Sequence, residues 1–144
     1  MLVRQILAAK GSDVETTRPD ATIAEVARQL REKRIGALVV IDERAMLCGI
    51  ISERDLARGL ADHGAGLLDL KVAKLMTAKV VTCSPDDGID RLRQQMTEGR
   101  FRHLPVVEEG KMIGIISIGD VVKHRVQELE AETQVLQDYI AGSA

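Results

Sequence analysis

The amino-acid sequence predicts an α/β (α+β) fold built from two repeated β-α-β-β-α units, with flanking helices at the N- and C-terminal ends. Two observations carry this prediction: identical residues recur at a fixed spacing, and each repeat alternates strand-like and helix-like patterns. The chain has 144 residues, of which 45% are hydrophobic and 29% are charged. This balance is typical of a folded globular chain.

The repeat has an offset of 66 residues in the first part of each unit. It pairs Val14, Thr16, Pro19, Asp20, Ile23, Gln29, Glu32, Arg34, Leu38 and Val40 with Val80, Thr82, Pro85, Asp86, Ile89, Gln95, Glu98, Arg100, Leu104 and Val106. The offset becomes 65 where Gly49-Ile-Ile-Ser52 recurs as Gly114-Ile-Ile-Ser117. One residue is therefore missing from a turn of the second unit, where a deletion is well tolerated.

The first unit begins with a short strand over 14–17, followed by a turn at Pro19 and Asp20. A helix then starts at Thr22-Ile-Ala-Glu25, which fits a capping box and opens a run of apolar residues spaced by three and four. Apolar runs over 36–41 and 47–52 predict two strands joined by a polar turn. A second helix is expected over 52–62.

The second unit repeats this order, with a strand over 80–83, a helix over 86–98, strands over 103–108 and 112–117, and a helix from Ser117 onward. Between the units, Leu68, Val72 and Leu75 have roughly helical spacing and predict a connector helix over 67–76. The domain assignment is therefore a first unit with an N-terminal helix (1–66), a connector (67–78), and a second unit with an extended C-terminal helix (79–144).

The closing helix carries an apolar stripe at alternating spacings of four and three: Val122, Val126, Leu129, Thr133, Leu136 and Ile140. This heptad pattern is shorter than a coiled coil needs for assignment from sequence. Packing of the stripe on its own chain and contact with a partner are both open.

Composition and length exclude several classes of protein. With 20 Lys and Arg against 22 Asp and Glu, and 1% aromatic residues, the chain lacks the basic field and stacking platforms of a nucleic-acid-binding protein. Its apolar runs are too short to span a bilayer or form a secretory leader, so we expect no membrane partner and a cytoplasmic location. Cys48 and Cys83 have no C-x-x-C spacing, and we expect reduced, packed thiols and no metal site.

The most informative residues are Ser52 and Asp55, and their counterparts Ser117 and Asp120. Each pair lies where an apolar strand becomes a helix, and such residues cap a helix. The same geometry presents backbone N–H groups and a hydroxyl to a phosphate, and a carboxylate can accept both hydroxyls of a ribose. Duplication in both units favours ligand binding in addition to capping.

The doubled unit, together with Arg100-Phe-Arg-His-Leu-Pro-Val-Val107, Gly49-Ile-Ile-Ser-Glu-Arg-Asp55 and Gly114-Ile-Ile-Ser-Ile-Gly-Asp120, resembles a tandem pair of CBS domains, named after cystathionine beta-synthase. The resemblance covers roughly residues 1–127. It implies two units packed as a pseudo-twofold pair. It also implies a regulatory module that binds AMP or a related adenine nucleotide, such as ATP, or NAD(H) or S-adenosylmethionine, in clefts between the units.

Carried over residue by residue, the resemblance implies that Asp55 and Asp120 accept the ribose, with Ser52 and Ser117 on the phosphate side. The backbone around Thr16 and Thr82 would read the adenine edge. The base pocket would be lined by residues at the second strand of each unit: Ala37, Val39, His103 and Pro105.

The two units differ at positions that bear on the ligand. The residue before the aspartate is Arg54 in the first unit and Gly119 in the second, and Arg102 and His103 stand where the first unit has Gly36-Ala37. We therefore expect unequal clefts. A cation at the helix start favours the terminal phosphate of AMP, and donors at the far rim favour the pyrophosphate of NAD(H).

The sequence predicts a sensor that transmits energy or redox state to an unidentified regulated protein, and it does not predict an enzyme. A triad of Ser117, His103 and Asp120 would require the aspartate to leave its own cap, and no G-x-S-x-G motif is present. A homodimer is expected, because the first helix of each unit has a wide apolar face and CBS pairs associate through such helices. The alternative function is a dimeric scaffold that binds no ligand.

Overall fold

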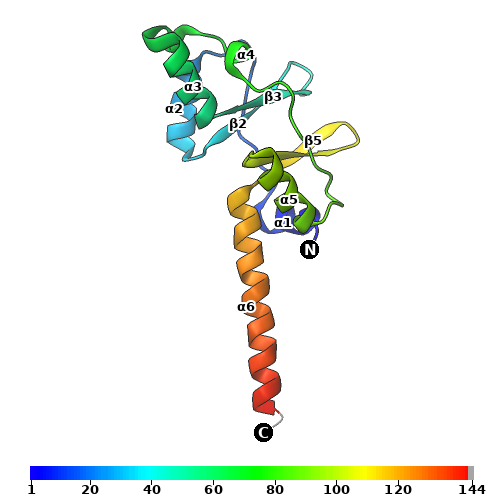
Figure 1. The fold of residues 1–144 in the computed structure, drawn as a ribbon. Helices are drawn as coiled ribbons and strands as arrows, with labels where there is room; N and C mark the ends of the chain where they lie inside the picture. The colour runs from blue at the N-terminus through cyan, green and yellow to red at the C-terminus, as the bar shows by residue number, and fades with distance from the viewer. Residues whose placement is uncertain (143–144) are drawn as a thin grey trace.

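The computed structural model describes residues 1–142, which form two units and a long closing helix (Figure 1). In the first unit, β1 (Thr16–Thr17) pairs in parallel with β2 (Ala37–Ile41), which pairs antiparallel with β3 (Leu47–Ser52). The helices of this unit are α2 (Ile23–Lys33) and α3 (Glu53–His63). The predicted order of elements is confirmed here, although the first strand is shorter than expected.

The start of α2 has the capping box that the sequence predicts. The Glu25 backbone N–H donates to Thr22 Oγ1 at 3.2 Å, and the Thr22 backbone N–H donates to Glu25 Oε2 at 3.4 Å. The apolar face of the helix, Ile23, Val26 and Leu30, is buried against the sheet. A periodicity of three and four therefore placed the correct side of this helix in the core.

The second unit contains α5 (Ile89–Gly99), the hairpin β4 (His103–Glu108) with β5 (Lys111–Ser117), and α6 (Ile118–Gly142). The strand predicted over 80–83 is wrong, because the structure has only an isolated parallel bridge from Cys83 to Val106. The Cys83 N–H donates to the Pro105 carbonyl, and the Val107 N–H donates to the Cys83 carbonyl. A single residue in register with β4 is too short to count as a strand.

The connector is also different from the prediction. In place of one helix over 67–76, it has a 3-10 helix, η1 (Gly64–Asp69), followed by the short α4 (Val72–Leu75). The chain is extended between them because Ile23 N–H donates to the Leu70 carbonyl and Val72 N–H donates to the Ala21 carbonyl, both at 2.9 Å. These tertiary hydrogen bonds replace the helical ones that the spacing suggested.

The N-terminal helix α1 (Val3–Lys10) makes the matching connection on the other unit. Val3 N–H donates to the Asp87 carbonyl, and Ile89 N–H donates to the Met1 carbonyl. Each unit therefore receives the same pair of hydrogen bonds, one unit from the start of the chain and the other from the connector. This pattern is that of a pseudo-twofold pair.

Residues 1–142 form two hydrophobic cores, one in each unit, and each core includes the attached segment. The first core joins α2, β2 and β3 to Leu67 of η1 and Val72 of α4. The second joins α5, β4 and β5 to Val3 and Ile6 of α1. The helix that opens the chain therefore packs into the core of the second unit.

The closing helix α6 has 25 residues and extends away from both units beyond its first turns (Figure 1). The described apolar stripe is exposed, with Val122, Val126, Leu129 and Leu136 between 45% and 62% accessible. These four side chains are not buried against their own chain. Among the helices of residues 1–142, none combines the length and apolarity needed to cross a bilayer.

Candidate functional site

The two Ser-x-x-Asp segments lie at equivalent strand-to-helix junctions, β3 to α3 and β5 to α6. In the first, the Glu53 N–H donates to the Gly36 carbonyl at 3.0 Å. In the second, the Ile118 N–H donates to the Arg102 carbonyl at 2.8 Å. Each helix start is thereby fixed to the residue just before the neighbouring strand, Gly36 before β2 and Arg102 before β4, where the two units differ in sequence.

A cleft of about 590 Å³, named here the Asp55 cleft, lies at the first junction and includes residues of both units. Its volume falls within the range of small-molecule sites. The lining residues are Gly36, Ile50, Ser52, Glu53, Arg54, Asp55, Arg58, Thr77, Gly99, Arg100, Phe101, Arg102, His103, Ser117, Ile118 and Gly119.

Asp55 is 8% exposed and lines this cleft. Its Oδ2 accepts the Ser52 backbone N–H at 2.9 Å and the Ser52 hydroxyl at 3.1 Å, and its Oδ1 accepts the Thr77 hydroxyl at 3.4 Å. The capping role is therefore present. The long contact to Thr77 leaves Oδ1 able to accept a shorter hydrogen bond from a ligand hydroxyl.

Positive charge predominates around the Asp55 cleft. Arg54 and Arg58 come from α3, and Arg100 and Arg102 come from the second unit, against the carboxylates of Glu53 and Asp55. The Arg54 guanidinium donates to the Arg100 carbonyl at 3.1 Å, which connects the two units at the rim. Together with the N-terminal end of α3, these guanidinium groups favour an anionic group such as a phosphate.

His103 lines both this cleft and a smaller one described next. Burial lowers the pKa of His103, and the nearby ammonium of Lys10 and guanidinium of Arg102 lower it further, against the opposite effect of Asp120. These effects favour the neutral imidazole, which can both donate and accept a hydrogen bond.

A second cleft of about 290 Å³, named here the Lys10 cleft, lies beside the β5 to α6 junction. Its lining residues are Lys10, Asp13, Val14, Glu15, Ile35, Gly36, Ala37, His103, Ile115 and Ser117. Asp120 Oδ2 accepts the Ser117 backbone N–H at 2.9 Å, and the Asp120 N–H donates to Ser117 Oγ at 3.1 Å. Lys10 Nζ lies 2.6 Å from the same Asp120 oxygen.

The structure brings most of the predicted site residues to these two clefts. Ser52, Arg54, Asp55, Arg102, His103 and Ser117 line the Asp55 cleft, and Ala37, His103 and Ser117 line the Lys10 cleft. Arg54 and Arg102, which the sequence assigned to different clefts, thus lie on the same one. This follows from the pseudo-twofold packing, which builds each cleft from both units.

Five predicted residues do not line either cleft, as far as residues 1–142 are described. Val39 and Pro105 are buried in the sheets, and Thr16 pairs with Val39 in the β1 to β2 register. Thr82 is exposed just before the bridge at Cys83. Asp120 is adjacent to the Lys10 cleft and reaches it through Lys10.

Sequence reasoning missed Arg100, which adds charge to the Asp55 cleft, and it also missed Thr77 and Lys10. Lys10 ends α1, which attaches to the second unit, and Thr77 follows α4, which attaches to the first unit. A weak repeat could have indicated that these two segments are equivalent, because Val3-Arg-Gln-Ile6 in α1 resembles Val72-Ala-Lys-Leu75 in α4. The longer repeat at offset 66 concealed this second one, because the two have different offsets.

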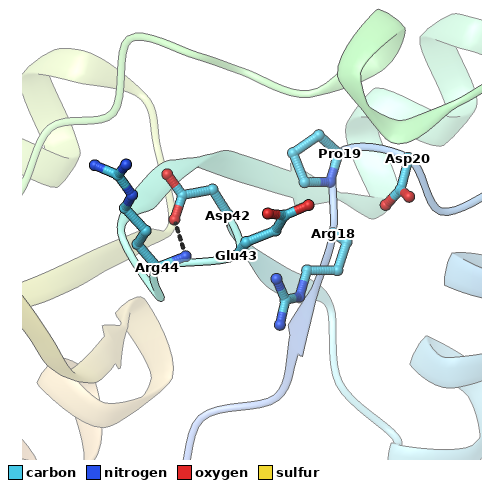
Figure 2. Close-up of a pocket in the computed structure, with 6 residues that line it drawn as sticks. All are labelled: Arg18, Pro19, Asp20, Asp42, Glu43 and Arg44. Carbon is cyan, nitrogen blue, oxygen red and sulfur yellow. Dashed lines mark hydrogen bonds between the residues drawn. The ribbon is translucent and has the colours of Figure 1, made fainter.

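A third hollow of about 630 Å³ lies at the turn after β1 and the turn between β2 and β3 (Figure 2). The figure shows Asp42 accepting a hydrogen bond from the Arg44 backbone N–H, at 2.8 Å. The hollow has two arginines, Arg18 and Arg44, against the acidic residues Asp20, Asp42 and Glu43. Acidic residues outnumber the arginines, and all of these charges come from turn residues, so this hollow lacks the excess of positive charge that the Asp55 cleft has and is not the candidate site.

The described residues also bear on the expectations for metal and for the two thiols. Within residues 1–142, no group of three or more His, Cys, Asp or Glu side chains is placed to hold a metal ion. Both cysteines are free thiols, and Cys83 is buried. Burial, with a smaller effect of Asp87, raises the pKa of Cys83 to about 12, so this thiol is a packing residue and not a nucleophile.

Comparisons with known proteins agree with this architecture. The CBS domain family model matches residues 3–62 and 72–127. The mitochondrial CBS domain-containing protein CBSX3 of Arabidopsis thaliana is 39% identical over 127 residues, which cover 85% of this chain and 62% of that protein. An uncharacterized 17.7 kDa protein of Acidianus ambivalens is 36% identical over 123 residues, which cover 81% of this chain and 73% of that protein. The chain thus spans less than two thirds of CBSX3, and 22% of the Arabidopsis protein CBSCBSPB5.

Solved structures show the same fold. The CBS-domain containing protein ATU1752 from Agrobacterium tumefaciens is 48% identical with a TM-score of 0.84, covering 86% of this chain and 92% of that one. The CBS domain pair of protein MJ0100, in complex with 5-methylthioadenosine and S-adenosyl-L-methionine, is 26% identical with a TM-score of 0.79. The match covers 89% of this chain and 98% of that one. This chain therefore belongs to the CBS domain family and carries two CBS domains in tandem.

Proposed function

We propose that this protein is a sensor that binds an adenine nucleotide in the Asp55 cleft without changing it chemically. CBS-pair proteins are generally regulatory, and the MJ0100 pair was crystallised with two adenosine-containing ligands. The observation that carries the proposal is the position of Asp55, a capping carboxylate that lines a cleft between the two units, beside a cluster of arginines.

The roles within the cleft follow from charge and geometry. Asp55 accepts the ribose hydroxyls, while Ser52 and the N-terminal end of α3 face the phosphate side. Arg54 and Arg102, one from each unit, provide charge for the phosphates. The single phosphate of AMP would contact one cluster of donors, whereas the longer pyrophosphate of NAD(H) would extend between both units. These two ligands are therefore the first to test.

The partners are proposed on separate grounds. The exposed stripe on α6 supports a homodimer, because apolar side chains at heptad spacing favour association of two helices. A regulated protein would read the state of the ligand. The same stripe favours the second candidate function, a dimeric scaffold that binds no ligand.

Isothermal titration calorimetry with AMP, ATP, NADH and S-adenosylmethionine separates these functions. A sensor binds at least one of these ligands without turnover, an enzyme consumes it, and a scaffold binds none. Asp55→Ala is expected to weaken nucleotide binding by about ten- to hundredfold, because it removes charge-assisted hydrogen bonds worth about 1.5 to 3 kcal/mol.

The matched control is Asp69→Ala, which removes an exposed carboxylate at the end of η1, outside the cleft. It should bind nucleotide as the wild type does. Unchanged affinity in the Asp55→Ala, Asp120→Ala double variant would show that these carboxylates do not hold the ligand.

A further inference from the structure

The last residue of α1, Lys10, is held by groups of the second unit. Its Nζ lies 2.6 Å from Asp120 Oδ2 and donates to the Ile115 carbonyl at 3.0 Å. The Lys10 side chain is 32% exposed and the Asp120 side chain 20%. This is a short, mostly buried ion pair between residues that are 110 positions apart in the sequence.

The equivalent carboxylate of the first unit has a different environment. Asp55 accepts hydrogen bonds from two hydroxyls and a backbone N–H, and it lines its cleft directly. On the other side, Lys10 lines the cleft, and Asp120 is not among its described lining residues. The cleft next to Lys10 is also about half the size of the other, 290 Å³ against 590 Å³.

These two environments differ in what a ribose must displace. A hydroxyl or a backbone N–H is a neutral donor and can share a carboxylate with a ligand, because it lacks the full opposite charge that an ammonium brings to the same oxygen. An ammonium at 2.6 Å makes a charge-assisted bond, and it occupies the oxygen that also accepts the Ser117 N–H. A ribose diol that uses both carboxylate oxygens must therefore break the Lys10 contact.

We propose that Lys10 is an internal occupant of the second site, whose ammonium holds Asp120 in place of a ribose. A nucleoside then binds the Asp55 cleft first and enters the Lys10 cleft only by displacing Lys10. This inference rests on the proposed function, since it assumes an adenosine-containing ligand. It adds a residue that determines the order in which two sites fill.

The position of Lys10 connects this order to the fold. Lys10 ends the helix whose Val3 and Ile6 belong to the core of the second unit. Displacement of the ammonium removes the ion pair between α1 and α6. Occupancy of the second site is therefore transmitted to α1 and α6, at the two ends of the described chain. Occupancy of the Asp55 cleft breaks no such ion pair.

The test is calorimetric titration with adenosine, which carries the ribose but no phosphate. Wild type should bind adenosine at one site per chain. Lys10→Met removes the ammonium at similar side-chain length and should reveal a second site, with affinity at least about tenfold higher than any second wild-type site. Adding Asp120→Asn to Lys10→Met should abolish the second site.

Two controls test whether the ammonium itself is responsible. Lys10→Arg keeps the charge and should behave as the wild type does. Lys111→Met removes an exposed lysine at the start of β5 and should leave the titration unchanged. If Lys10→Met fails to fold by circular dichroism, Lys10→Gln gives the same test, with a smaller gain expected because its amide can still donate.

Several outcomes would overturn the inference while the proposed function stands. One is that wild type binds adenosine at the Asp55 cleft while Lys10→Met shows no added site or weaker binding. A loss of AMP affinity in Lys10→Met with adenosine unchanged would make Lys10 a phosphate ligand and not an occupant. If neither wild type nor Lys10→Met binds adenosine or AMP, the proposed function itself fails.

Discussion

Gly49 and Gly114 occupy the same position of the two repeats, but a side chain would meet different obstacles there. A Cβ at Gly49 would lie 2.6 Å from the backbone oxygen of Thr77. This is where the connector crosses β3, with Ile50 and Thr77 exchanging backbone hydrogen bonds at 2.9 and 3.0 Å. A Cβ at Gly114 would lie 2.6 Å from the side-chain end of Leu7 in α1. Both glycines therefore allow the segment that attaches to the opposite unit to cross closely.

Gly49→Ala is expected to destabilise the protein more than Gly114→Ala, because a backbone oxygen cannot move aside as a leucine methyl can. Overpacking of this kind costs about 1 to 3 kcal/mol, and the Gly114 variant should cost less than about 1 kcal/mol after Leu7 changes rotamer. The measurement is the free energy of unfolding in urea. Gly119→Ala, whose Cβ would meet only Ser117 Oγ at 3.5 Å, is the control. Equal losses at Gly49 and Gly114 would contradict this account.

At the scale of elements, α1 is attached to the second unit by its apolar face and by the ion pairs of Arg4 and Lys10. Arg4 contacts Asp86 at 2.8 Å on the surface, where both side chains are more than half exposed. Lys10 contacts Asp120 in a less exposed position. Exposed pairs contribute little to stability, so the pair at the end of α1 is the one whose loss should be measurable.

The contribution of this pair should depend on pH. Burial alone would raise the pKa of Asp120, but the hydrogen bonds from Lys10 and Ser117 outweigh burial and lower it. A carboxyl whose pKa is lower in the folded than in the unfolded chain stabilises the fold above the ordinary range near ~4, and this stability is lost as the pH falls through the lowered value. At pH 7, Lys10→Met should lower Tm by a few degrees, which corresponds to about 1 kcal/mol.

The thermal unfolding of wild type and Lys10→Met, followed from pH 7 down to about pH 3, checks this prediction. Their difference in Tm should shrink in acid as Asp120 becomes protonated. Arg4→Met provides the control, since removal of an exposed pair should change Tm little at any pH. A difference that is constant with pH would mean that Lys10 stabilises the fold by packing and not by its charge.

For the whole molecule, the sequence was informative where the relevant pattern is local or repeated. The duplicated Gly-x-x-Ser segments and the capping box at Thr22 predicted two similar units and the place of the candidate site. The break in the connector helix at Leu70 and the single bridge at Cys83, in place of a strand, were not predictable. Both depend on hydrogen bonds to residues distant in sequence. The pairing of Lys10 with Asp120 belongs to the same class, since only the packing of α1 on the second unit brings them together.

The arrangement of the whole molecule leaves the stripe on α6 exposed, and its charges favour a second copy of the chain. With Val126 and Leu129 at the seam, Arg125 and Glu130 flank it at the positions that pair between parallel helices of a coiled coil. Two parallel copies would thus place Arg125 of one chain beside Glu130 of the other, twice by symmetry. Like charges do not meet at these flanking positions.

Sedimentation velocity at micromolar concentration should therefore show a dimer for the wild type. Leu129→Glu should raise the dissociation constant at least about tenfold, because it places a charge in the apolar seam. Val135→Glu is the matched control: Val135 is 67% exposed on the same helix but lies off the stripe, so this variant should remain dimeric. Both side chains are exposed in the single chain, so a charge at either position disturbs no core and a difference between the variants reports on association. A wild type that is monomeric with and without AMP would refute the dimer, and a dimer insensitive to Leu129→Glu would place the contact on other helices.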